Sequence, residues 1–333
     1  MNKSLTDLNT FGIKAKAEQL IEIHSVTQLQ TVLKEVSDPF FVLGGGSNIL
    51  LLNDLKGTVL KICIPKIKIE REFKHSVYLS AGGGVNWHQL VLYAVKNDLG
   101  GLENLSLIPG TVGASPMQNI GAYGVEIKDV FHRLEAVEIT TGKLVMFRKK
   151  EMNFGYRTSV FKNKLKGKYI ITKVWFKLTK PPHRLRLSYG AIKTVLKDSG
   201  ITKPNIQAVS QAVIKIRSEK LPDPSEIGNA GSFFKNPVIK MKLFSRIRQS
   251  YPTIPHYPQP EGTIKLPAAW LIEQCGWKGK RVGNTGTHIR QALVLVNHQN
   301  ATGTEIFELA QKIQESVRQK FAISLEMEVN IWD

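Results

Sequence analysis

Three glycine-rich loops are the part of this sequence best suited to hold a large polar ligand. The longest, 108–124, combines several glycines with two prolines and carries no charged side chain. Glycine lets backbone N–H and C=O groups approach a ligand closely, and proline fixes the path of a loop in advance. Shorter loops at 43–50 and 81–85 repeat the pattern. We therefore predict a cofactor site in which main-chain hydrogen bonds do most of the binding.

Three side chains outside these loops could take part in chemistry. Arg157 lies beside a glycine and aromatic residues, a setting that can hold a guanidinium for a substrate carboxylate, although a surface ion pair is the alternative. Ser232 precedes two phenylalanines and could give up a proton in a dry pocket, or be structural. Glu328 is either a pocket carboxylate or part of a solvated strand edge. No G-x-S-x-G motif is present, which disfavours a hydrolase.

Metal and disulfide chemistry are not indicated. Cys63 and Cys275 lie far apart and outside any C-x-x-C motif, and the eight histidines include no H-E-x-x-H. His288 stands out for its polar neighbours rather than for metal binding. We expect both cysteines to be buried core thiols, with a redox role as the alternative.

The elements that must position these residues alternate between strands and helices. Apolar runs at 40–43 and 49–52 flank the first glycine loop and predict strand, loop, strand. Helical spacing from Trp87 to Val95 predicts a helix that ends at Gly100, and 135–139 and 169–176 read as strands. The glycine spacings match neither a Walker nor a Rossmann loop. The middle of the chain is predicted to be α+β.

The second half of the sequence contains further helix signals. A helical run at 207–217 is followed by a Pro-rich break at 220–224, and the Pro-rich stretch 251–260 predicts an ordered excursion. Pro267 can start a helix that Gly276 ends, and Thr302 with Glu305 predicts a capping box. Alternation over 325–331 predicts a final strand with one apolar face.

The overall charge is strongly positive, with 46 Lys and Arg against 27 Asp and Glu, a net charge of +19 over 333 residues. The basic residues are scattered and accompany no nucleic-acid-binding motif, so we expect no nucleic-acid partner. A solvated basic surface or steering of anionic substrates explains them. The N-terminus has no apolar leader, and no run approaches the roughly 18 apolar residues of a spanning helix. We expect a cytoplasmic protein without membrane insertion.

Taken together, these motifs resemble the UDP-N-acetylenolpyruvoylglucosamine reductase family over essentially the whole chain. The motifs follow the order found in that family, and they lie at 9–12, 44–48, 108–113, 118–124, 154–157, 220–222, 231–237 and 325–329. Tyr257 in the Pro-rich excursion is similar to the substrate-covering loop of the family's tyrosine-loop type. Another FAD-dependent oxidoreductase of the same fold, with a different substrate, remains the alternative.

The resemblance implies a fold and a division of the chain. The fold class would be α+β, an FAD-binding fold of the vanillyl-alcohol-oxidase (PCMH) type in two subdomains with a smaller α+β substrate-binding domain. Residues 1–68 would form the first subdomain, completed by 306–333, and 69–214 the second. Residues 215–305 would bind substrate. Nothing in the sequence suggests an obligate interface, so we expect a monomer.

The implied activity is the reduction of UDP-N-acetylglucosamine-enolpyruvate to UDP-N-acetylmuramate in peptidoglycan precursor synthesis. NADPH would give a hydride to flavin N5, and N5 would pass a hydride to C3 of the enolpyruvyl group. By the resemblance, Arg157 and Glu328 would stabilise the enolate-like intermediate and Ser232 would donate the proton to C2. A preorganised guanidinium stabilises developing carboxylate charge better than water does.

The remaining implied roles follow the motifs. FAD would be held non-covalently, because Ser47 stands where covalent relatives in the wider superfamily have a linking histidine. Asn330 departs from the family pattern, in which arginine is common. The implied cofactor-binding residues are Gly44, Gly45, Gly46, Ser47, Asn48, Ile49, Pro109, Gly110, Thr111, Gly113, Ala114, Ser115, Gln118, Asn119, Gly121, Ala122, Tyr123 and Gly124. The implied substrate contacts are Tyr156, Tyr189, Arg217, Lys220, Asn236, Tyr257, Lys278 and Gln291.

Overall fold

The computed structural model describes residues 2–189 and 191–333 and divides into two compact units. Unit 1 comprises Ala17–Gly45 and Lys56–Glu219, and unit 2 comprises Asn2–Lys16, Gly46–Leu55 and Lys220–Asp333. Gly190, next to the predicted Tyr189, lies outside the described residues, as does Met1. The predicted three-part division at 68, 214 and 305 stays a prediction.

The first sheet of unit 1 packs against helix α1 (Val26–Glu35) around a small apolar core. Strand β5 (Leu55–Ile62) lies between β2 (Lys16–Ile23) and β3 (Phe40–Leu43), and β3 runs parallel to β5. Helix α1 begins at Ser25, whose side chain accepts a hydrogen bond from the Gln28 amide. Ile23, Leu29 and Leu60 are fully buried in this core.

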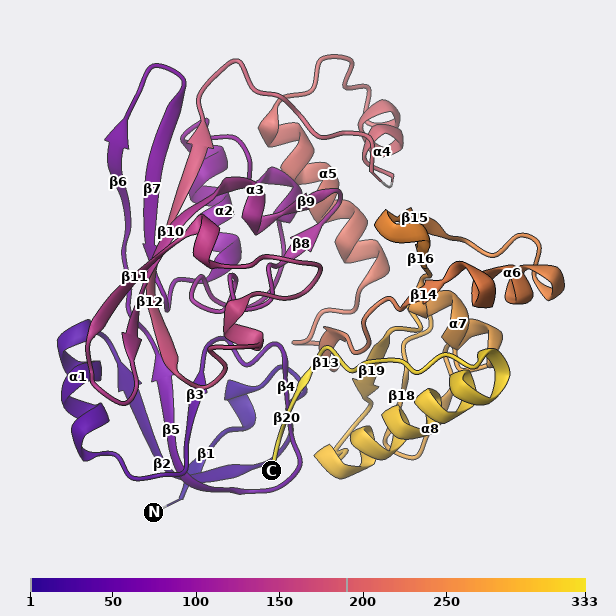
Figure 1. Cartoon of the computed structure of the whole chain (residues 1–333), viewed down its shortest axis with the longest axis horizontal. Helices are drawn as coiled ribbons and strands as arrows, with labels where there is room; N and C mark the ends of the chain where they lie inside the picture. The colour runs from indigo at the N-terminus through magenta and orange to yellow at the C-terminus, as the bar shows by residue number, and fades with distance from the viewer. Residues whose placement is uncertain (1, 190) are drawn as a thin grey trace. The chain divides into compact units, whose positions relative to one another are not determined.

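The second sheet of unit 1 is antiparallel and has five strands in the order β11-β10-β12-β7-β6 (Figure 1). The strands are β6 (Ile67–Glu72), β7 (Ser76–Gly82), β10 (Phe131–Glu138), β11 (Leu144–Arg148) and β12 (Tyr169–Thr179). Side chains alternate along a strand, so one face of this sheet is apolar and buried.

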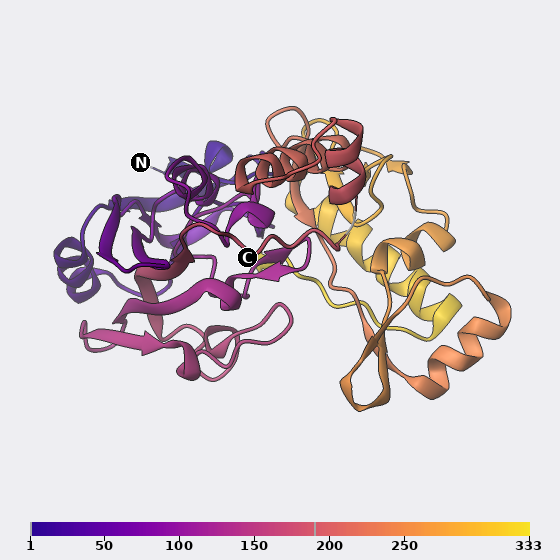
Figure 2. The ribbon, with the colours of Figure 1, turned by 90° about the horizontal axis from the view of Figure 1, so that it is seen from above.

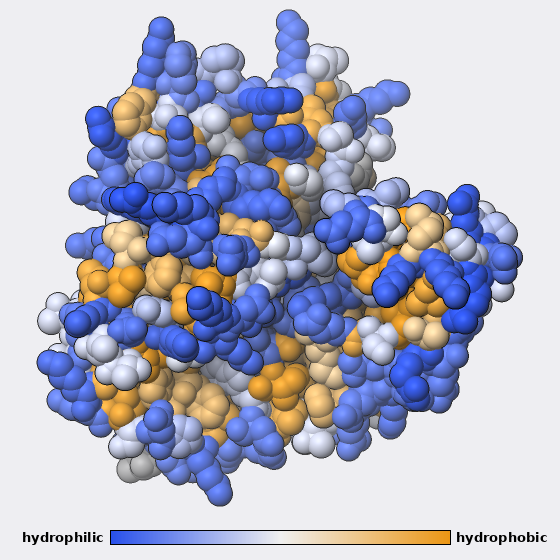
Figure 3. Space-filling view, viewed as in Figure 1, coloured by the Kyte–Doolittle hydropathy of each residue, from blue (hydrophilic) through white to orange (hydrophobic). Residues whose placement is uncertain are grey.

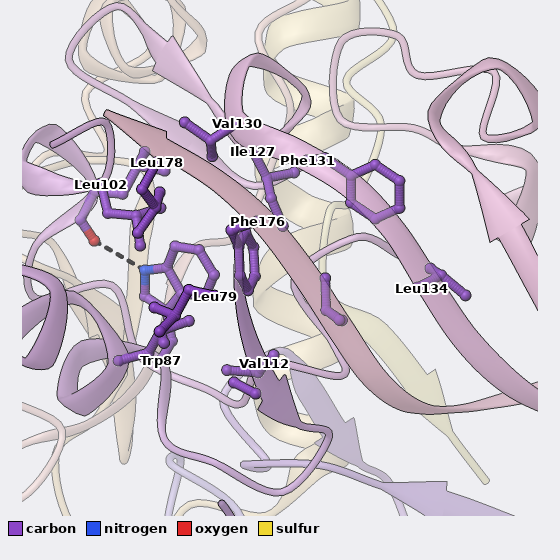
Figure 4. Packing of buried hydrophobic residues seen from close by; sticks show 14 of the residues in the cluster. Leu79, Trp87, Leu102, Val112, Ile127, Val130, Phe131, Leu134, Phe176 and Leu178 are labelled. Atoms are coloured by element: carbon purple, nitrogen blue, oxygen red, sulfur yellow. Dashed lines mark hydrogen bonds between the residues drawn. The ribbon is translucent and has the colours of Figure 1, made fainter. Parts of the chain in front are cut away.

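Helix α2 (Trp87–Lys96) packs into the core on that face (Figure 4). The Trp87 indole meets the Phe176 ring edge to face at 5.9 Å between centroids, and its Nε1 donates to the Leu105 carbonyl at 3.0 Å. A large ring can be buried here because its one polar atom is hydrogen-bonded. The helix and both predicted strands of this region are confirmed.

The rest of unit 1 consists of short segments and two helices that pack on each other. These are α3 (Ile127–Val130), α4 (Ile192–Asp198), α5 (Ile206–Lys220), β8 (Gly121–Ala122), β9 (Val125–Glu126) and the 3₁₀ turns at Glu103–Leu105, Lys149–Glu151 and Val160–Lys162. Helices α4 and α5 share a core that includes Ile192, Val209 and Val213 (Figures 1 and 2).

Unit 2 contains three small sheets and three helices among its described residues. The sheet order is β13-β19-β18-β17 in one, β14-β16-β15 in another, and β20 pairs in parallel with β4. The strands are β1 (Lys3–Ser4), β4 (Ile49–Leu51), β13 (Gly228–Ser232), β14 (Val238–Lys240), β15 (Tyr257–Gln259), β16 (Thr263–Lys265), β17 (Arg281–Val282), β18 (Thr285–Thr287), β19 (Val294–Asn297) and β20 (Asn330–Trp332).

The helices of unit 2 are α6 (Met241–Ser250), α7 (Ala268–Gln274) and α8 (Gly303–Phe321), with 3₁₀ turns at Thr6–Leu8 and Pro260–Gly262. Helix α8, yellow in Figures 1 and 2, packs on β18, β19 and α7. It begins with the predicted capping box, in which Thr302 and Glu305 bond to each other's backbone amides. The prediction of its buried stripe from Ile306 to Val317 is also confirmed.

Two predictions made from the sequence, about the final strand and about the cysteines, are wrong. The final strand covers only Asn330–Trp332. The residues before it lie beside the residues after β13 and form an isolated bridge and single backbone hydrogen bonds with them instead of a regular ladder. The predicted alternation still holds in burial, since Leu325 and Val329 are buried and Glu326 is exposed. Cys63 and Cys275 are partly exposed free thiols and not buried core residues. Burial nevertheless suffices to raise the pKa of both thiols.

The surface carries the excess positive charge predicted from composition. The face shown in Figure 3 is largely hydrophilic, with apolar areas between the hydrophilic side chains. No Lys or Arg is buried within the described residues, so their side chains are at least partly solvated.

Candidate functional site

The three predicted glycine loops meet inside unit 1. The amides of Val112 and Gly113 donate to the carbonyls of Val85 and Gly83, each at 2.9 Å, and Trp87 N donates to Gly110 O at 3.0 Å. A side chain at Gly45 would place its Cβ 2.8 Å from Gly110 Cα. The loops at 44–45, 83–85 and 110–113 thus form one continuous main-chain surface.

The glycines of this surface let the loops pack closely and leave main-chain groups available to the predicted cofactor. A Cβ at Gly44 would lie 2.7 Å from Thr111 Oγ1, and one at Gly113 would lie 3.0 Å from Gly83 O. Glycine is therefore required because the loops pack against one another, and not only because a ligand approaches them. The result is a cradle of backbone amide and carbonyl groups with few side chains, which suits the polar dinucleotide part of FAD.

Two of the predicted cofactor-binding side chains hold the cradle together. The Ser115 hydroxyl donates to Val112 O at 2.7 Å within its own loop. The fully buried Asn119 donates to Gly155 O at 2.9 Å and accepts from the Lys128 amide at 3.1 Å. Asn119 therefore connects the long glycine loop to the segment that carries Arg157.

Arg157 lies in a strained turn beside this loop. The turn is closed by hydrogen bonds between the backbones of Gly155 and Thr158, and Arg157 has φ of +52°. This position of a turn favours glycine or asparagine, so an arginine there costs free energy. Its Nη2 donates to Gly121 O at 2.7 Å, which fixes the guanidinium against the glycine loop. A strained backbone at a predicted catalytic residue supports a functional role.

A second arginine, Arg217, forms a partly buried cluster with His88 and Tyr123 in the same unit. Arg217 Nε donates to Leu107 O at 3.2 Å, and the Leu107 amide donates to His88 Nδ1 at 3.0 Å. Burial, and then the charge of Arg217, lower the pKa of His88. Burial also lowers the pKa of Arg217 and raises that of Tyr123. Among the described residues of unit 1, no carboxylate forms an ion pair with Arg217, so the cluster suits an anionic ligand.

Two predicted substrate contacts lie near this cluster. Tyr189 is half exposed and meets Tyr123 edge to face at 6.4 Å between ring centroids. The Tyr156 ring lies under the Arg157 guanidinium, 5.5 Å from its carbon to the ring centroid. Asn104, which was not predicted from the sequence, is fully buried and donates to Tyr123 O and Arg186 O, both at 2.9 Å. No local motif distinguishes it from an ordinary polar residue.

Ser232 lies in unit 2 at the end of β13, and its placement follows from a bulge. The pairing of β13 with β19 slips between Asn229 and Ser232, and Gly231 has φ of +67°. The Gly231 amide donates to Asn229 Oδ1 at 2.9 Å, which fixes the slip. Bulges commonly re-aim a side chain next to an active site. The Ser232 side chain is exposed at this point of the unit.

Glu328 lies on a segment that runs beside the residues immediately after β13. Two predicted catalytic residues, Ser232 and Glu328, are therefore close in the structure. The Glu328 amide donates to Phe233 O at 2.8 Å, one residue after Ser232. The Asn48 side chain donates to Glu328 O at 3.2 Å, and Asn330 donates to Asn48 O through both its backbone and its side chain. The first glycine loop, Glu328 and Ser232 are thus linked within unit 2, and Asn330 has a structural role there.

The other predicted substrate contacts of unit 2 are spread over its surface. Asn236 accepts from the amide of Ala268 at 2.9 Å and so helps to start α7. Lys278 forms an ion pair with Glu273 at 3.0 Å. Gln291 accepts from the Leu293 amide at 3.4 Å beside β19, near Ser232. Tyr257 is 46% exposed on β15, and Lys220 is exposed at the end of α5.

Comparison with known proteins places this arrangement in a family. The chain is 49% identical to the UDP-N-acetylenolpyruvoylglucosamine reductase of Flavobacterium johnsoniae, covering 99% of this chain and 98% of that protein. It is also 49% identical to that of Amoebophilus asiaticus and 46% identical to that of Pseudomonas fluorescens, with 99% of this chain covered in each case. The chain belongs to the UDP-N-acetylenolpyruvoylglucosamine reductase family.

Two family models match in agreement with this membership. Residues 17–148 match an FAD-binding domain, and residues 223–332 match the C-terminal domain of UDP-N-acetylenolpyruvoylglucosamine reductase. The first match contains all three glycine loops, and the second contains Ser232 and Glu328. FAD is therefore the cofactor of this chain, and the prediction of a flavoprotein is confirmed.

Solved structures confirm the predicted fold class. The reductase of Thermus caldophilus covers this whole chain with a TM-score of 0.71 at 24% identity. The p-cresol methylhydroxylase structure covers 97% of the chain with a TM-score of 0.50 at 14% identity. The chain is thus α+β with an FAD-binding fold of the vanillyl-alcohol-oxidase (PCMH) type.

Neither a membrane helix nor a metal cluster is found in the described chain. None of the helices within 2–189 and 191–333 is both long and apolar enough to cross a bilayer. Over the same residues, no group of three or more His, Cys, Asp and Glu side chains could hold a metal ion.

Proposed function

We propose that this chain reduces the enolpyruvyl group of UDP-N-acetylenolpyruvoylglucosamine to give UDP-N-acetylmuramate, a step of peptidoglycan precursor synthesis. The observation that carries the proposal is the near full-length identity of 46–49% to reductases of that name. The structural support is the linkage of Ser232, Glu328 and the first glycine loop by hydrogen bonds within unit 2.

The residues that hold FAD belong to the glycine loops. In unit 1 the main chain of 44–45 and 109–124 supplies amide and carbonyl groups, and in unit 2 Gly46, Ser47, Asn48 and Ile49 continue the first loop. Ser47 carries no nucleophilic ring nitrogen, so we infer non-covalent binding. When bound, FAD supplies the hydride that C3 of the enolpyruvyl group receives, and NADPH is the proposed donor that reduces it.

Three side chains perform the chemistry in this proposal. Ser232 donates a proton to C2, where negative charge develops as C3 gains a hydride. Arg157, held by Gly121 O, orients a guanidinium toward the substrate carboxylate and stabilises that charge electrostatically. Glu328, fixed by its own amide and carbonyl, contributes to the same intermediate.

The remaining contacts bind the UDP part of the substrate. Arg217 is the strongest candidate to bind the diphosphate, because it is partly buried and no carboxylate of unit 1 forms an ion pair with it among the described residues. Lys220, Lys278, Asn236, Gln291, Tyr156 and Tyr189 are further proposed contacts. The exposed Tyr257 on the β15–β16 hairpin suits a loop that covers the bound substrate. We also propose that the protein works as a monomer in the cytoplasm.

The visible spectrum of the purified protein under anaerobic conditions tests the whole proposal. It is recorded before NADPH, after one equivalent of NADPH, and after addition of UDP-N-acetylglucosamine-enolpyruvate. We expect flavin bands that bleach with NADPH and return with the enolpyruvyl substrate. Bands that bleach but do not return would assign a different substrate, and bands that NADPH does not bleach would assign a different donor. Light scattering of the same sample measures whether it is a monomer.

A further inference from the structure

A cavity of about 440 Å³ lies on the five-stranded sheet of unit 1. It is lined by Glu70, Arg71, Phe73, Tyr78, His132, Arg133 and Trp175. These residues come from β6, β7, β10 and β12, and from the turn after β6 (Figure 1). None of them belongs to a glycine loop or to the proposed substrate contacts. Its size is within the range of small-molecule sites.

Two β-bulges direct charged side chains to this cavity. The register of β6 with β7 shifts between Ile69 and Arg71, and that of β10 with β12 shifts between Phe131 and Arg133. A bulge turns side chains away from the regular alternation of a strand and is common next to functional sites. Both shifts fall at the two arginines of the cavity. Register shifts in two different strand pairs thus occur beside the same cavity.

The walls of the cavity are aromatic. Phe73 meets Tyr78 edge to face at 5.6 Å between ring centroids, and Tyr78 meets His132 at 4.4 Å. Trp175 is buried and 6% exposed, whereas Phe73 is 40% exposed. A large exposed ring at the mouth and a buried ring inside provide planar surfaces on which a flat ligand can stack.

The charge around these rings is positive. The guanidinium carbon of Arg133 lies 4.7 Å from the centroid of Trp175, and that of Arg71 lies 4.7 Å from that of Phe73. Lys173 Nζ lies 5.3 Å from the Trp175 centroid. Burial and the charge of Arg133 lower the pKa of His132. A cationic ligand would be repelled here, so the cavity differs from an aromatic cage for ammonium groups.

The neighbouring carboxylates do not neutralise the two arginines. Glu70 accepts from Ser80 at 2.8 Å and pairs with Lys68 at 3.2 Å. Glu72 pairs with Lys180 at 3.0 Å, and Glu135 accepts from Thr172 at 2.8 Å. Among the described residues, no carboxylate forms an ion pair with either arginine of the cavity. An anionic ligand would therefore meet uncompensated positive charge.

Two buried donors at this cavity have no partner. Arg133 Nε and Trp175 Nε1 are covered by protein and make no hydrogen bond within the described structure. An unpartnered buried donor is unfavourable, and such groups are uncommon in native proteins. Because both atoms are covered, an acceptor reaches them only when the Arg133 side chain moves off the Trp175 ring. A ligand oxygen would then satisfy donors that the protein leaves unpaired.

We propose that this cavity binds a free nucleoside monophosphate. The base stacks on the exposed Phe73 ring with its edge toward Tyr78, and the phosphate is held by the guanidinium groups of Arg71 and Arg133. A phosphate accepts bidentate hydrogen bonds from arginine, and an aromatic base provides the flat surface that the walls match. The site is independent of the reductase activity.

Isothermal titration of the FAD-containing protein with AMP tests the proposal. Saturating UDP-N-acetylmuramate and bound FAD keep the probe out of the cofactor and substrate sites. Adenosine and inorganic phosphate are titrated separately. We expect AMP to bind to one site, on the order of tenfold or more tightly than either fragment, because ring and phosphate contacts act together. No AMP binding up to millimolar concentration would overturn the proposal.

Substitutions locate the binding. Arg71→Gln with Arg133→Gln should weaken AMP binding on the order of tenfold, and Phe73→Ala about fivefold or more. Lys149→Gln with Lys150→Gln removes the same charge from exposed positions outside the cavity and should change the affinity less than about twofold. All variants should keep wild-type kcat/KM for the reductase reaction. Equal effects of the two double variants would mean that AMP responds only to net charge, and the proposal would fail.

A short oligonucleotide separates a free nucleotide from a nucleic acid. In the same titration, a hexamer of adenylate should bind no more tightly than AMP once affinities are compared per nucleotide. Strong binding of the hexamer with no detectable AMP binding would assign the cavity to single-stranded nucleic acid and overturn the proposal for a free nucleotide.

Discussion

At the scale of single residues, Arg157 and Ser232 illustrate two ways of fixing a side chain for chemistry. Arg157 is fixed by a strained turn and by its bond to Gly121 O, and Ser232 by a bulge and a glycine with positive φ. In both cases the backbone departs from a regular element, and at Arg157, where a residue other than glycine has positive φ, the departure costs free energy. Such strain is expected where position matters more than stability.

Replacement of the proposed proton donor separates the two half-reactions. In Ser232→Ala, NADPH should still bleach the flavin at the wild-type rate, because this hydroxyl takes no part in that step. Reoxidation by the enolpyruvyl substrate should slow on the order of 10²-fold or more, since the proton to C2 is missing. Anaerobic stopped-flow absorbance measures both rates. Ser225→Ala, on an exposed turn of the same unit, is the control, and equal reoxidation rates in wild type and Ser232→Ala would remove Ser232 from the mechanism.

His88 should make the stability of the protein depend on pH. Its pKa is lowered in the folded protein by burial and by Arg217, so between that pKa and the ordinary value near 6.5 the unfolded chain binds more protons. The free energy of unfolding should therefore fall as the pH is lowered from 7 to 5.

The substitution His88→Asn keeps an acceptor for the Leu107 amide and removes the titration. Urea unfolding at pH 7 and pH 5 should show a smaller loss of stability in this variant than in wild type. His75→Asn changes an exposed histidine and should leave the loss unchanged. An identical pH dependence in all three proteins would contradict the assignment to His88.

At the scale of elements, the packing of the glycine loops predicts where flavin binding is most sensitive. Gly45→Ala would bring a Cβ to 2.8 Å from Gly110 Cα, and the loops would have to separate. We expect a loss of about 1–3 kcal/mol of stability and a large drop in bound flavin, measured as the ratio of flavin to protein absorbance. Gly142→Ala meets nothing within 4 Å but strains a positive φ. It should lower stability while retaining flavin, and a flavin loss equal to that of Gly45→Ala would contradict this view.

Much of the fold and of the glycine loops could be predicted from the sequence. The features that could not be predicted depend on contacts between residues that are distant in the sequence. The glycine loops, α2, α7 and the capped α8 follow from local signals, and the loops indeed meet in unit 1. The length of the final strand could not be predicted, since it depends on which partner backbone is within reach. The same holds for Asn104 and for the cavity around Trp175, whose residues come together through the register of strands that are distant in sequence.

At the scale of the whole molecule, the net charge of +19 should act on the rate of substrate capture. The substrate carries a diphosphate and a carboxylate, so the field of the protein steers it toward the surface. The screening length falls from about 30 Å at 0.01 M salt to about 10 Å at 0.1 M. We therefore expect kcat/KM for the enolpyruvyl substrate to fall roughly threefold or more over this range.

The maximal rate provides the internal control for this prediction. At saturating substrate, encounter no longer limits turnover, and kcat should change little with salt. Steady-state kinetics at constant pH and temperature measure both quantities. A kcat/KM that is independent of salt would mean that the basic surface serves only solubility.

The bond between Asn48 and Asn330 also sets an order of events during synthesis of the chain. The two residues are 282 positions apart. In the first glycine loop, the carbonyl of Asn48 accepts hydrogen bonds from the backbone and the side chain of Asn330. At translation rates of about 5–20 residues per second, roughly 15 to 60 seconds separate the emergence of the two. A nascent chain therefore cannot complete this loop until Asn330 has left the ribosome, and flavin capture should follow the emergence of that residue.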